Sequence, residues 1–392
     1  MAGYRALLSS PGATRLLASA LYARLPLGMA SLAVFLLVRD STGSIAAAGV
    51  AVGAYALGNA PTAPVQGALV DRHGQARVLV PSALAQSSLL VALTATARAH
   101  GPLALSVVLA GLAGAAAPPL SAAARALWPR ILPDAASLER FYALDAVTQE
   151  AIWILGPLIV AASVVLAGPD VAVLLCAAIS ATGTILFCTN PASRAWRPDG
   201  VARRRGGALA SSGLRVLLCS IVLTGCAWGC LSVGIPALAV HLGSAQDAGI
   251  LLTLTSVGSL AGGLAYGGRA WRIPLERRYA VLLAGIAVSA LPLILVDDLR
   301  LAAPLAAVLG LAWAPTMSCQ YALVGRTAPA GSVTEAFTWN TSAFVGGAAV
   351  GSAIAGAVAE SAGPGTAFAL LGACALAGAA IAVNVRRRLA VA

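Results

Sequence analysis

The 392-residue sequence contains no lysine, since all 25 Lys-or-Arg positions are arginine, and it has only 14 acidic residues. Charged residues make up 10% of the chain and hydrophobic residues 59%, whereas a soluble domain carries about a quarter charged residues. So few polar side chains cannot cover the surface of a water-soluble globule. The composition therefore predicts a protein whose outer surface faces lipid.

The residues of common catalytic motifs are also missing. Without lysine there is no Walker-type phosphate loop, and neither H-E-x-x-H nor G-x-S-x-G occurs. The seven cysteines show no C-x-x-C or other metal-ligand spacing, and they lie in apolar stretches as small buried hydrophobes do. We therefore expect no enzymatic activity, no ATP-driven transport, no cofactor and no metal site.

Apolar segments recur along the whole chain, separated by short polar breaks. A transmembrane helix needs about 20 mostly apolar residues. The predicted spans are 16–38, 45–69, 78–97, 103–124, 141–166, 170–189, 215–240, 249–268, 279–296, 301–323, 337–359 and 365–385. The first is predicted to be a permanent span, because no cleavage site of small residues follows a short apolar core. We expect an all-α integral membrane protein with twelve transmembrane helices.

The arginines are distributed unevenly about these spans. With the N-terminus in the cytoplasm, all but four fall in predicted cytoplasmic segments, among them Arg125. The four exceptions are Arg24 within the first span and Arg39, Arg98 and Arg300 outside. Arginine-rich loops remain cytoplasmic, so we expect an inner or plasma membrane protein with both termini inside. This topology explains the net charge of +11 without a nucleic-acid partner.

Two halves are visible in the sequence. Arg130, Pro133, Glu139 and Phe141 recur 196 residues later, half the chain length, as Arg326, Pro329, Glu335 and Phe337. The segment 190–214 is rich in Arg, Gly and Ser, which is typical of a linker. We predict one six-helix bundle in 1–189 and another in 215–392, related by a pseudo-two-fold axis. Transporters with repeated halves bind their substrate at the interface between the repeats.

The loop after the second span carries a recognisable motif. It reads Gly67-Ala-Leu-Val-Asp71-Arg72-His73-Gly74, and Arg77 follows, although Gln75 and Ala76 stand where a basic pair is usual. This loop resembles the signature loop of the major facilitator superfamily. The resemblance implies a two-bundle secondary transporter in which Asp71 and arginine partners latch the cytoplasmic side in the outward-facing state. The alternative is an ordinary polar loop.

The fifth span shows a second, partial match. Gly156-Pro157 resembles the end of a glycine-rich motif in drug/proton antiporters of this superfamily, but Leu158 to Ala161 depart from it. The resemblance implies an efflux antiporter. A helix kink or a packing point explains the same two residues equally well.

Three ionisable residues lie inside predicted spans: Arg24, Asp145 and Glu150. Such residues are costly, rare and usually functional. At a rise of 1.5 Å per residue, Arg24 is about 12 Å and Glu150 about 13–14 Å deep. Equal depth and opposite charge predict an ion pair between these two, either for coupling or for structure alone, and Asp145, nearer the cytoplasm, is the next candidate.

Seven polar or aromatic residues within the spans are candidates for a substrate cavity: Asn59, Gln149, Trp153, Trp228, Trp313, Gln320 and Asn340. The tryptophans could instead be interfacial anchors.

Together these features favour a monomeric transporter that exports a small amphipathic or hydrophobic molecule in exchange for protons. Glu150, with Asp145 beside it, would then be the protonatable group. The expected partners are this small molecule, protons and the lipid bilayer. Two alternatives stay open: uptake or facilitated diffusion of a metabolite by the same fold, and a membrane receptor or scaffold that transports nothing.

Overall fold

The computed structural model describes residues 13–132, 134–196, 206–242, 247–269 and 271–389. Within these ranges every regular element is a helix. The first half contains α2 (Ala13–Thr42), α3 (Ile45–His73), α4 (Gln75–Arg98), α5 (Leu103–Ala115), α6 (Leu120–Ile131), α7 (Ala135–Ala167), α8 (Pro169–Thr189) and α9 (Pro191–Arg194). The second contains η1 (Gly207–Ala210), α10 (Ser212–His241), α11 (Ala248–Gly267), α12 (Leu275–Ala290), η3 (Leu291–Ile294), α13 (Leu299–Gly310), α14 (Trp313–Thr327), α15 (Val333–Ala362) and α16 (Gly365–Leu389).

Each of the twelve predicted spans coincides with one helix or with two consecutive helices, so the all-helical architecture is confirmed. The fourth span is divided into α5 and α6, and the tenth into α13 and α14. Eleven of these segments are long and apolar enough to cross a membrane. The remaining one is α3, whose second half contains Asn59, Pro61, Pro64 and Gln66.

The break between α5 and α6 follows from two consecutive prolines. Pro118 and Pro119 lack amide donors and cannot continue a helix. Side chains of α3 satisfy carbonyl groups beside the break: Gln66 Nε2 donates to Ala115 O at 2.7 Å. Asn59 Nδ2 donates to Gly114 O at 3.2 Å. Membrane interiors require such internal partners for freed backbone groups.

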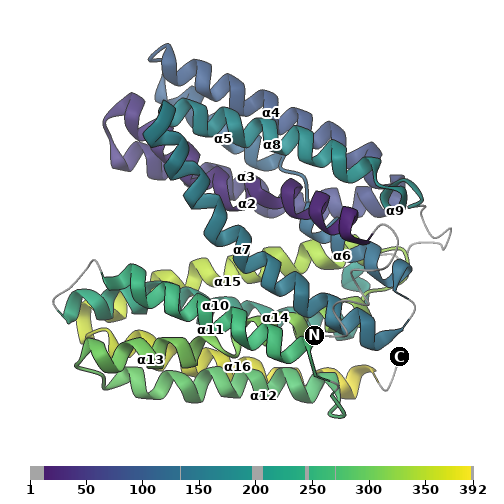
Figure 1. Ribbon diagram of the computed structural model, residues 1–392, viewed down its shortest axis with the longest axis vertical. Helices are drawn as coiled ribbons and strands as arrows, with labels where there is room; N and C mark the ends of the chain where they lie inside the picture. Colours follow the sequence, from purple (N-terminus) through teal and green to yellow (C-terminus); the bar gives the residue numbers. More distant parts are fainter. Residues whose placement is uncertain (1–12, 133, 197–205, 243–246, 270, 390–392) are drawn as a thin grey trace.

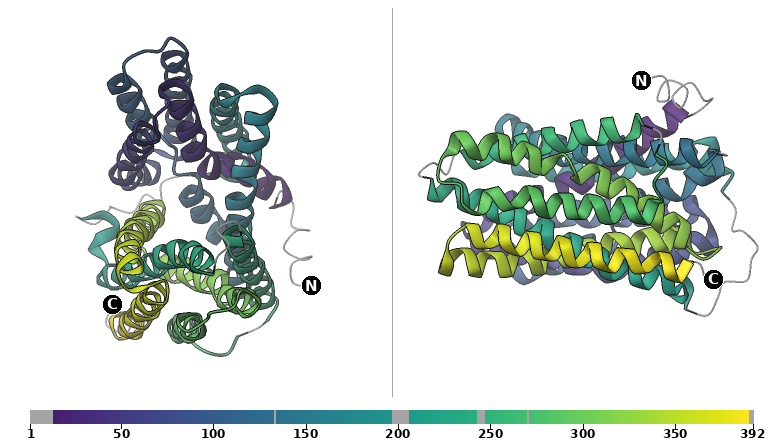
Figure 2. Two further views of the ribbon diagram at one scale, coloured as in Figure 1. Left: turned by 90° about the vertical axis from the view of Figure 1, so that its left-hand side faces the viewer. Right: turned by 90° about the horizontal axis from the view of Figure 1, so that it is seen from below.

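The helices form two groups that diverge from a common end (Figure 1). The end-on view in Figure 2 separates the purple-to-teal helices of the first half from the green-to-yellow helices of the second. We call the common end, where α2 begins and α16 ends, the basic end, because Arg72, Arg130 and Arg326 lie there in the last turns of α3, α6 and α14. The halves touch through α3 against α15 and through α7 against α11 and α14. This basic end is the one that the arginine distribution predicts to be cytoplasmic.

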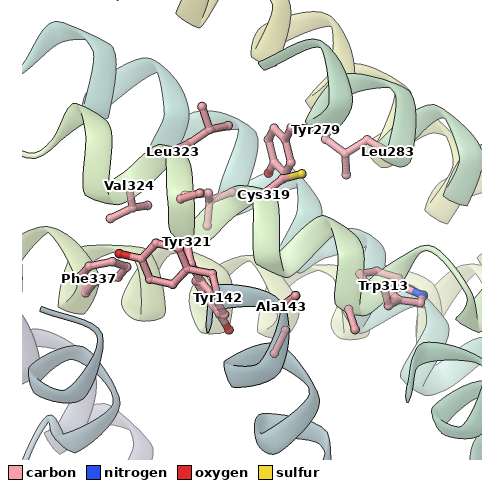
Figure 3. Packing of buried hydrophobic residues seen from close by; sticks show 14 of the residues in the cluster. Tyr142, Ala143, Tyr279, Leu283, Trp313, Cys319, Tyr321, Leu323, Val324 and Phe337 are labelled. Carbon is pink, nitrogen blue, oxygen red and sulfur yellow. The ribbon is translucent and has the colours of Figure 1, made fainter. Parts of the chain in front are cut away.

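The apolar core, like the helices, joins the two halves at the basic end. One cluster of buried side chains runs through the second half and continues into the parts of α2, α6 and α7 nearest the basic end. Figure 3 shows Tyr142 of α7 beside Tyr321 of α14 and Phe337 of α15. A second cluster, with Met29, Val34 and Leu93, contains residues of the first half alone. The halves therefore share a core at the basic end.

The segment predicted as a linker, 190–214, holds α9 and η1, and its residues 197–205 lie outside the described residues. That prediction includes four arginines, Arg197, Arg203, Arg204 and Arg205, which also lie outside them.

Candidate functional site

A buried charge cluster lies within the first half. Asp145 of α7 accepts a hydrogen bond from Arg24 Nη1 of α2 through Oδ1 at 2.6 Å, and from Arg125 Nε of α6 through Oδ2 at 2.7 Å. All three residues are at most 4% exposed. A buried carboxylate stabilises a buried guanidinium only where the geometry and the hydrogen bonds are good, as they are here.

Polar neighbours complete this cluster. Gln149, one turn along α7 from Asp145, accepts at Oε1 from Arg24 Nη2 (2.6 Å) and from Arg125 Nη2 (3.3 Å). Arg24 Nε donates to Ser121 Oγ at 3.0 Å. The guanidinium of Arg125 lies 3.7 Å above the ring of Tyr321, which belongs to α14 of the second half. The cluster thus touches the other half through a cation–π contact.

The predicted pair between Arg24 and Glu150 is wrong, because Arg24 pairs with Asp145. The predicted depth was also wrong, because α7 begins at Ala135 and not at residue 141, which places Asp145, and not Glu150, at the depth of Arg24. Direction around the helix was not considered either. Residues 145 and 149 are four apart and share one face of α7, whereas residue 150 is turned by about 100° from residue 149. That rotation directs Glu150 toward α11 instead of toward α2.

The cytoplasmic loop position predicted for Arg125 is also wrong. The apolar segment ends at about residue 124, but α6 continues to Ile131, so Arg125 lies within the helix and is buried. A charged residue that follows an apolar segment can still be buried within a helix if an oppositely charged side chain on a neighbouring helix pairs with it. Asp145 provides that counter-charge.

Glu150 forms a contact between the halves. Ser259 Oγ of α11 donates to Glu150 Oε1 at 3.0 Å. The same hydroxyl accepts from the amide of Ala314 at 3.1 Å, in the first turn of α14. Glu150 is buried, and no cationic side chain pairs with it among the residues that the structure describes. The carboxylate therefore lies near the positive end of the α14 dipole without a full counter-charge.

The other predicted cavity residues are scattered. Gln320 Nε2 donates to Asn340 Oδ1 at 2.7 Å, and both side chains are buried inside the second half. Trp228 packs edge-on against Trp313, with ring centroids 5.0 Å apart. Trp153 is half exposed. Asn59 contacts the α5–α6 break, and only Gln149 belongs to the charge cluster. Substrate contact by these residues stays a prediction.

The signature loop forms a second contact between the halves. Asp71 accepts from the amides of Thr334 (3.0 Å) and Glu335 (2.9 Å), which begin α15. A carboxylate is favourable at a helix N-terminus. Burial raises the pKa of Asp71 to about 6, against the opposing effect of these hydrogen bonds. Within the described chain, the partners of Asp71 are therefore backbone amides instead of the expected arginines, and Arg72 and Arg77 are exposed.

The two glycines of the loop have separate effects. A Cβ on Gly67 would lie 2.6 Å from Thr338 Oγ1 and 3.0 Å from Glu335 Cα, so only glycine lets α3 approach α15 this closely. Gly74 joins α3 to α4 with φ of 94°, a value that side-chain-bearing residues rarely adopt. The loop therefore contains both a close contact between the halves, at Gly67, and a tight turn, at Gly74.

An ion-pair network at the basic end was not predicted as a site. Glu139 of α7 binds Arg278 of α12 (2.9 Å) and Arg326 of α14 (3.2 Å), both in the other half. The signal in the sequence was the repeat that relates Glu139 to Glu335. In the second copy, Glu335 Oε2 accepts from the amide of Ala208 at 3.0 Å. Each of the two repeated glutamates thus binds a neighbouring segment of the chain at the basic end.

Comparisons with known proteins agree with this geometry. The family model described as the Major Facilitator Superfamily matches the chain twice, over residues 16–218 and 217–390. The curated proteins contain no match.

Several solved structures share the fold over nearly the whole chain. A bacterial homologue of the iron transporter ferroportin, in the outward-facing state, has a TM-score of 0.73 at 15% identity, covering 96% of this chain and 98% of that one. A human organic anion transporter has 0.69 at 16%, covering 94% and 98%. The fucose:proton symporter of E. coli has 0.70 at 17%, covering 97% and 99%. With both halves matched by the family model and the same two-half helical fold in these structures, the chain belongs to the major facilitator superfamily of membrane transporters.

Proposed function

We propose that this transporter exports a small amphipathic molecule in exchange for protons, with Glu150 as the proton carrier. The observation that carries the proposal is the contact of Glu150 with Ser259 across the two halves. An ionised carboxylate buried without a cation is costly in a membrane interior. The neutral acid therefore suits this conformation, and separation of α7 from α11 would expose Glu150 to water and release its proton.

Asp145 has a different role in this proposal. Two guanidinium groups face it, so its charged form is stabilised in place. A group held in one ionisation state is suited to orienting cargo and to balancing charge. We therefore assign proton carriage to Glu150 and positioning to the cluster of Arg24, Arg125 and Asp145.

The same cluster favours an acidic group on the cargo. Two guanidinium groups share one carboxylate, which leaves one positive charge without a counter-charge inside the cluster. A carboxylate or similar anion on the cargo would neutralise it when the cluster becomes accessible. One structural neighbour is a human organic anion transporter, and that is consistent with such a cargo.

The proposed direction rests on orientation and on the partial antiporter motif. If the basic end is cytoplasmic, as the arginine distribution predicts, this conformation is closed toward the cytoplasm. Glu150 would then take up its proton from the outer side, and release toward the cytoplasm would follow rearrangement. Gly156 of the motif packs against the backbone of Gly28, where its Cβ would lie 2.5 Å from Gly28 C. This close approach places α7 against α2 beside the charge cluster.

A vesicle experiment tests the proposal. The purified protein is reconstituted, a pH gradient is imposed, and uphill movement of candidate organic anions is measured for wild type and Glu150→Gln. We expect the variant to lose uphill transport while it keeps cargo exchange at equal pH, because exchange needs no net proton movement. Glu360→Gln, at the exposed end of α15, is the matched control and should behave as wild type. Undiminished uphill transport by folded Glu150→Gln would show that another group carries the proton.

A further inference from the structure

A pocket of about 250 Å³ lies at the basic end between the two halves, and none of its lining residues belongs to the buried charge cluster. One wall belongs to the start of α7 and the other to the end of α11 and the loop after it. The lining residues are Ala136, Glu139, Arg140, Tyr266, Gly267, Arg269 and Trp271. Neither proton carriage nor cargo binding, as proposed above, uses this pocket.

The described lining of the pocket carries more positive than negative charge. Among the lining residues that the structure describes, Glu139 is the one acid, and Arg278 and Arg326 already neutralise this carboxylate. Arg140 and Arg269 line opposite walls, and within the described part of the chain neither guanidinium donates a hydrogen bond to an acceptor. Two guanidinium groups free to donate, on opposite sides of one pocket, are suited to an oxyanion with several acceptor oxygens.

An aromatic wall holds one of these groups in place. Trp271 stacks on Tyr266 with ring centroids 5.1 Å apart, and Trp271 Nε1 donates to the carbonyl oxygen of Tyr266 at 3.0 Å. Arg269 lies 5.5 Å over the Trp271 ring. The guanidinium is therefore oriented by a fixed aromatic surface before any ligand arrives, which lowers the entropy lost on binding.

We propose that this pocket binds the phosphate group of an anionic phospholipid. Basic pockets between helices on the cytoplasmic side suit anionic headgroups, and tryptophan favours the same interfacial depth. Exposed Leu264 and Ile273, which flank the pocket residues in the sequence, offer an apolar surface for acyl chains. A free phosphate ion would use the same guanidinium groups but none of this apolar surface.

Binding at this pocket depends on conformation. Arg140 belongs to the first half and Arg269 to the second, so a phosphate that bridges them holds the basic end closed. Separation of α7 from α11 would divide the pocket. A ligand that binds one conformation better shifts the population toward it, so the lipid should favour the closed basic end.

The test uses the full-length protein in two kinds of vesicle, phosphatidylcholine alone and phosphatidylcholine with phosphatidylglycerol. Bound phosphatidylglycerol is measured by native mass spectrometry, and closure by amide hydrogen exchange over residues 334–337, whose first amides bond to Asp71. We expect phosphatidylglycerol to bind and to slow this exchange. Arg140→Gln and Arg269→Gln should each weaken binding about fivefold and remove the effect on exchange, whereas Arg140→Lys should retain part of both.

Arg277→Gln is the matched control, because Arg277 is an exposed arginine of the same region that does not line the pocket. If Arg277→Gln and Arg140→Gln weakened phosphatidylglycerol binding equally, the proposal would be overturned. The lipid would then be attracted by the overall positive charge and not by this pocket. Slower exchange in phosphatidylcholine vesicles with inorganic phosphate, but not with phosphatidylglycerol, would overturn the lipid as ligand. If neither phosphatidylglycerol nor inorganic phosphate slowed the amide exchange, the pocket would not be an anion-binding site.

Discussion

Asp145 and Glu150 lie five residues apart on α7, yet each faces a different half of the molecule. Asp145 accepts hydrogen bonds from two arginines of its own half. Glu150 accepts one from Ser259 of the other half. Five residues along a helix correspond to a rotation of about 140°, and this rotation separates a carboxylate that two arginines contact from one that contacts the other half.

Asp145→Asn should strongly destabilise the protein. The substitution leaves two buried guanidinium groups without a counter-charge, and breaking such a buried pair costs about 3–5 kcal/mol. Thermal unfolding in detergent measures the loss. Asp40→Asn, at an exposed position near the end of α2, should change the unfolding temperature little. A variant as stable as wild type would mean that water or lipid already solvates the arginines.

Gly67→Ala should block transport without preventing insertion into the membrane. The added Cβ would lie 2.6 Å from Thr338 Oγ1, so α3 must move away from α15. Overpacking of this kind costs about 1–3 kcal/mol. Gly49→Ala on the same helix is the control, since nothing lies within 4 Å of its added Cβ. Equal transport by the two variants would contradict the role given to the close approach of α3 and α15.

Closure of the basic end should depend on pH through Asp71. Burial in the closed state raises the pKa of Asp71 from its ordinary value of 3.8 to about 6. The neutral acid is therefore favoured in the closed state, and closing takes up a proton between about pH 4 and pH 6. The penalty for burying the ionised form is fully present above about pH 6, decreases as the pH falls from 6 to about 4, and is absent at lower pH.

Hydrogen exchange over residues 334–337 at a series of pH values measures this closure. Lower pH should slow the exchange, after correction for its intrinsic pH dependence, and Asp71→Asn should remove the trend. The groups that face or flank Asp71 are Glu335 on α15 and Arg72 and His73 on α3. If the exchange still depended on pH in Asp71→Asn, the titrating group would be Glu335 or His73 and not Asp71.

Asp71→Asn should also lower the maximal rate of transport more than the affinity for cargo. The amide can still accept one of the two backbone hydrogen bonds but carries no charge, and a lost helix cap costs about 0.5–2 kcal/mol. Rate and binding are measured separately in vesicles and in detergent. Reduced affinity at a normal maximal rate would place Asp71 in the cargo site.

Much of the architecture could be predicted from the sequence alone. Twelve apolar segments, few charges and a repeat at an interval of 196 residues suffice for an all-helical membrane protein in two halves, since only helices or closed barrels satisfy their backbone groups in lipid. The Gly67–Gly74 motif located the contact made by Asp71. The cytoplasmic orientation of the basic end remains a prediction of arginine placement.

Only the tertiary structure decided which charges meet. The sequence shows that Arg24, Arg125 and Asp145 lie in or beside apolar segments, but it does not show where each helix begins, how far it is rotated or which helix it faces. Those angles follow from packing, for example from the approach of Gly28 to Gly156 that brings α2 against α7. Packing therefore paired Arg24 with Asp145, placed Arg125 in the same cluster and left Glu150 in contact with the second half, because a side chain pairs with groups on the helix that it faces.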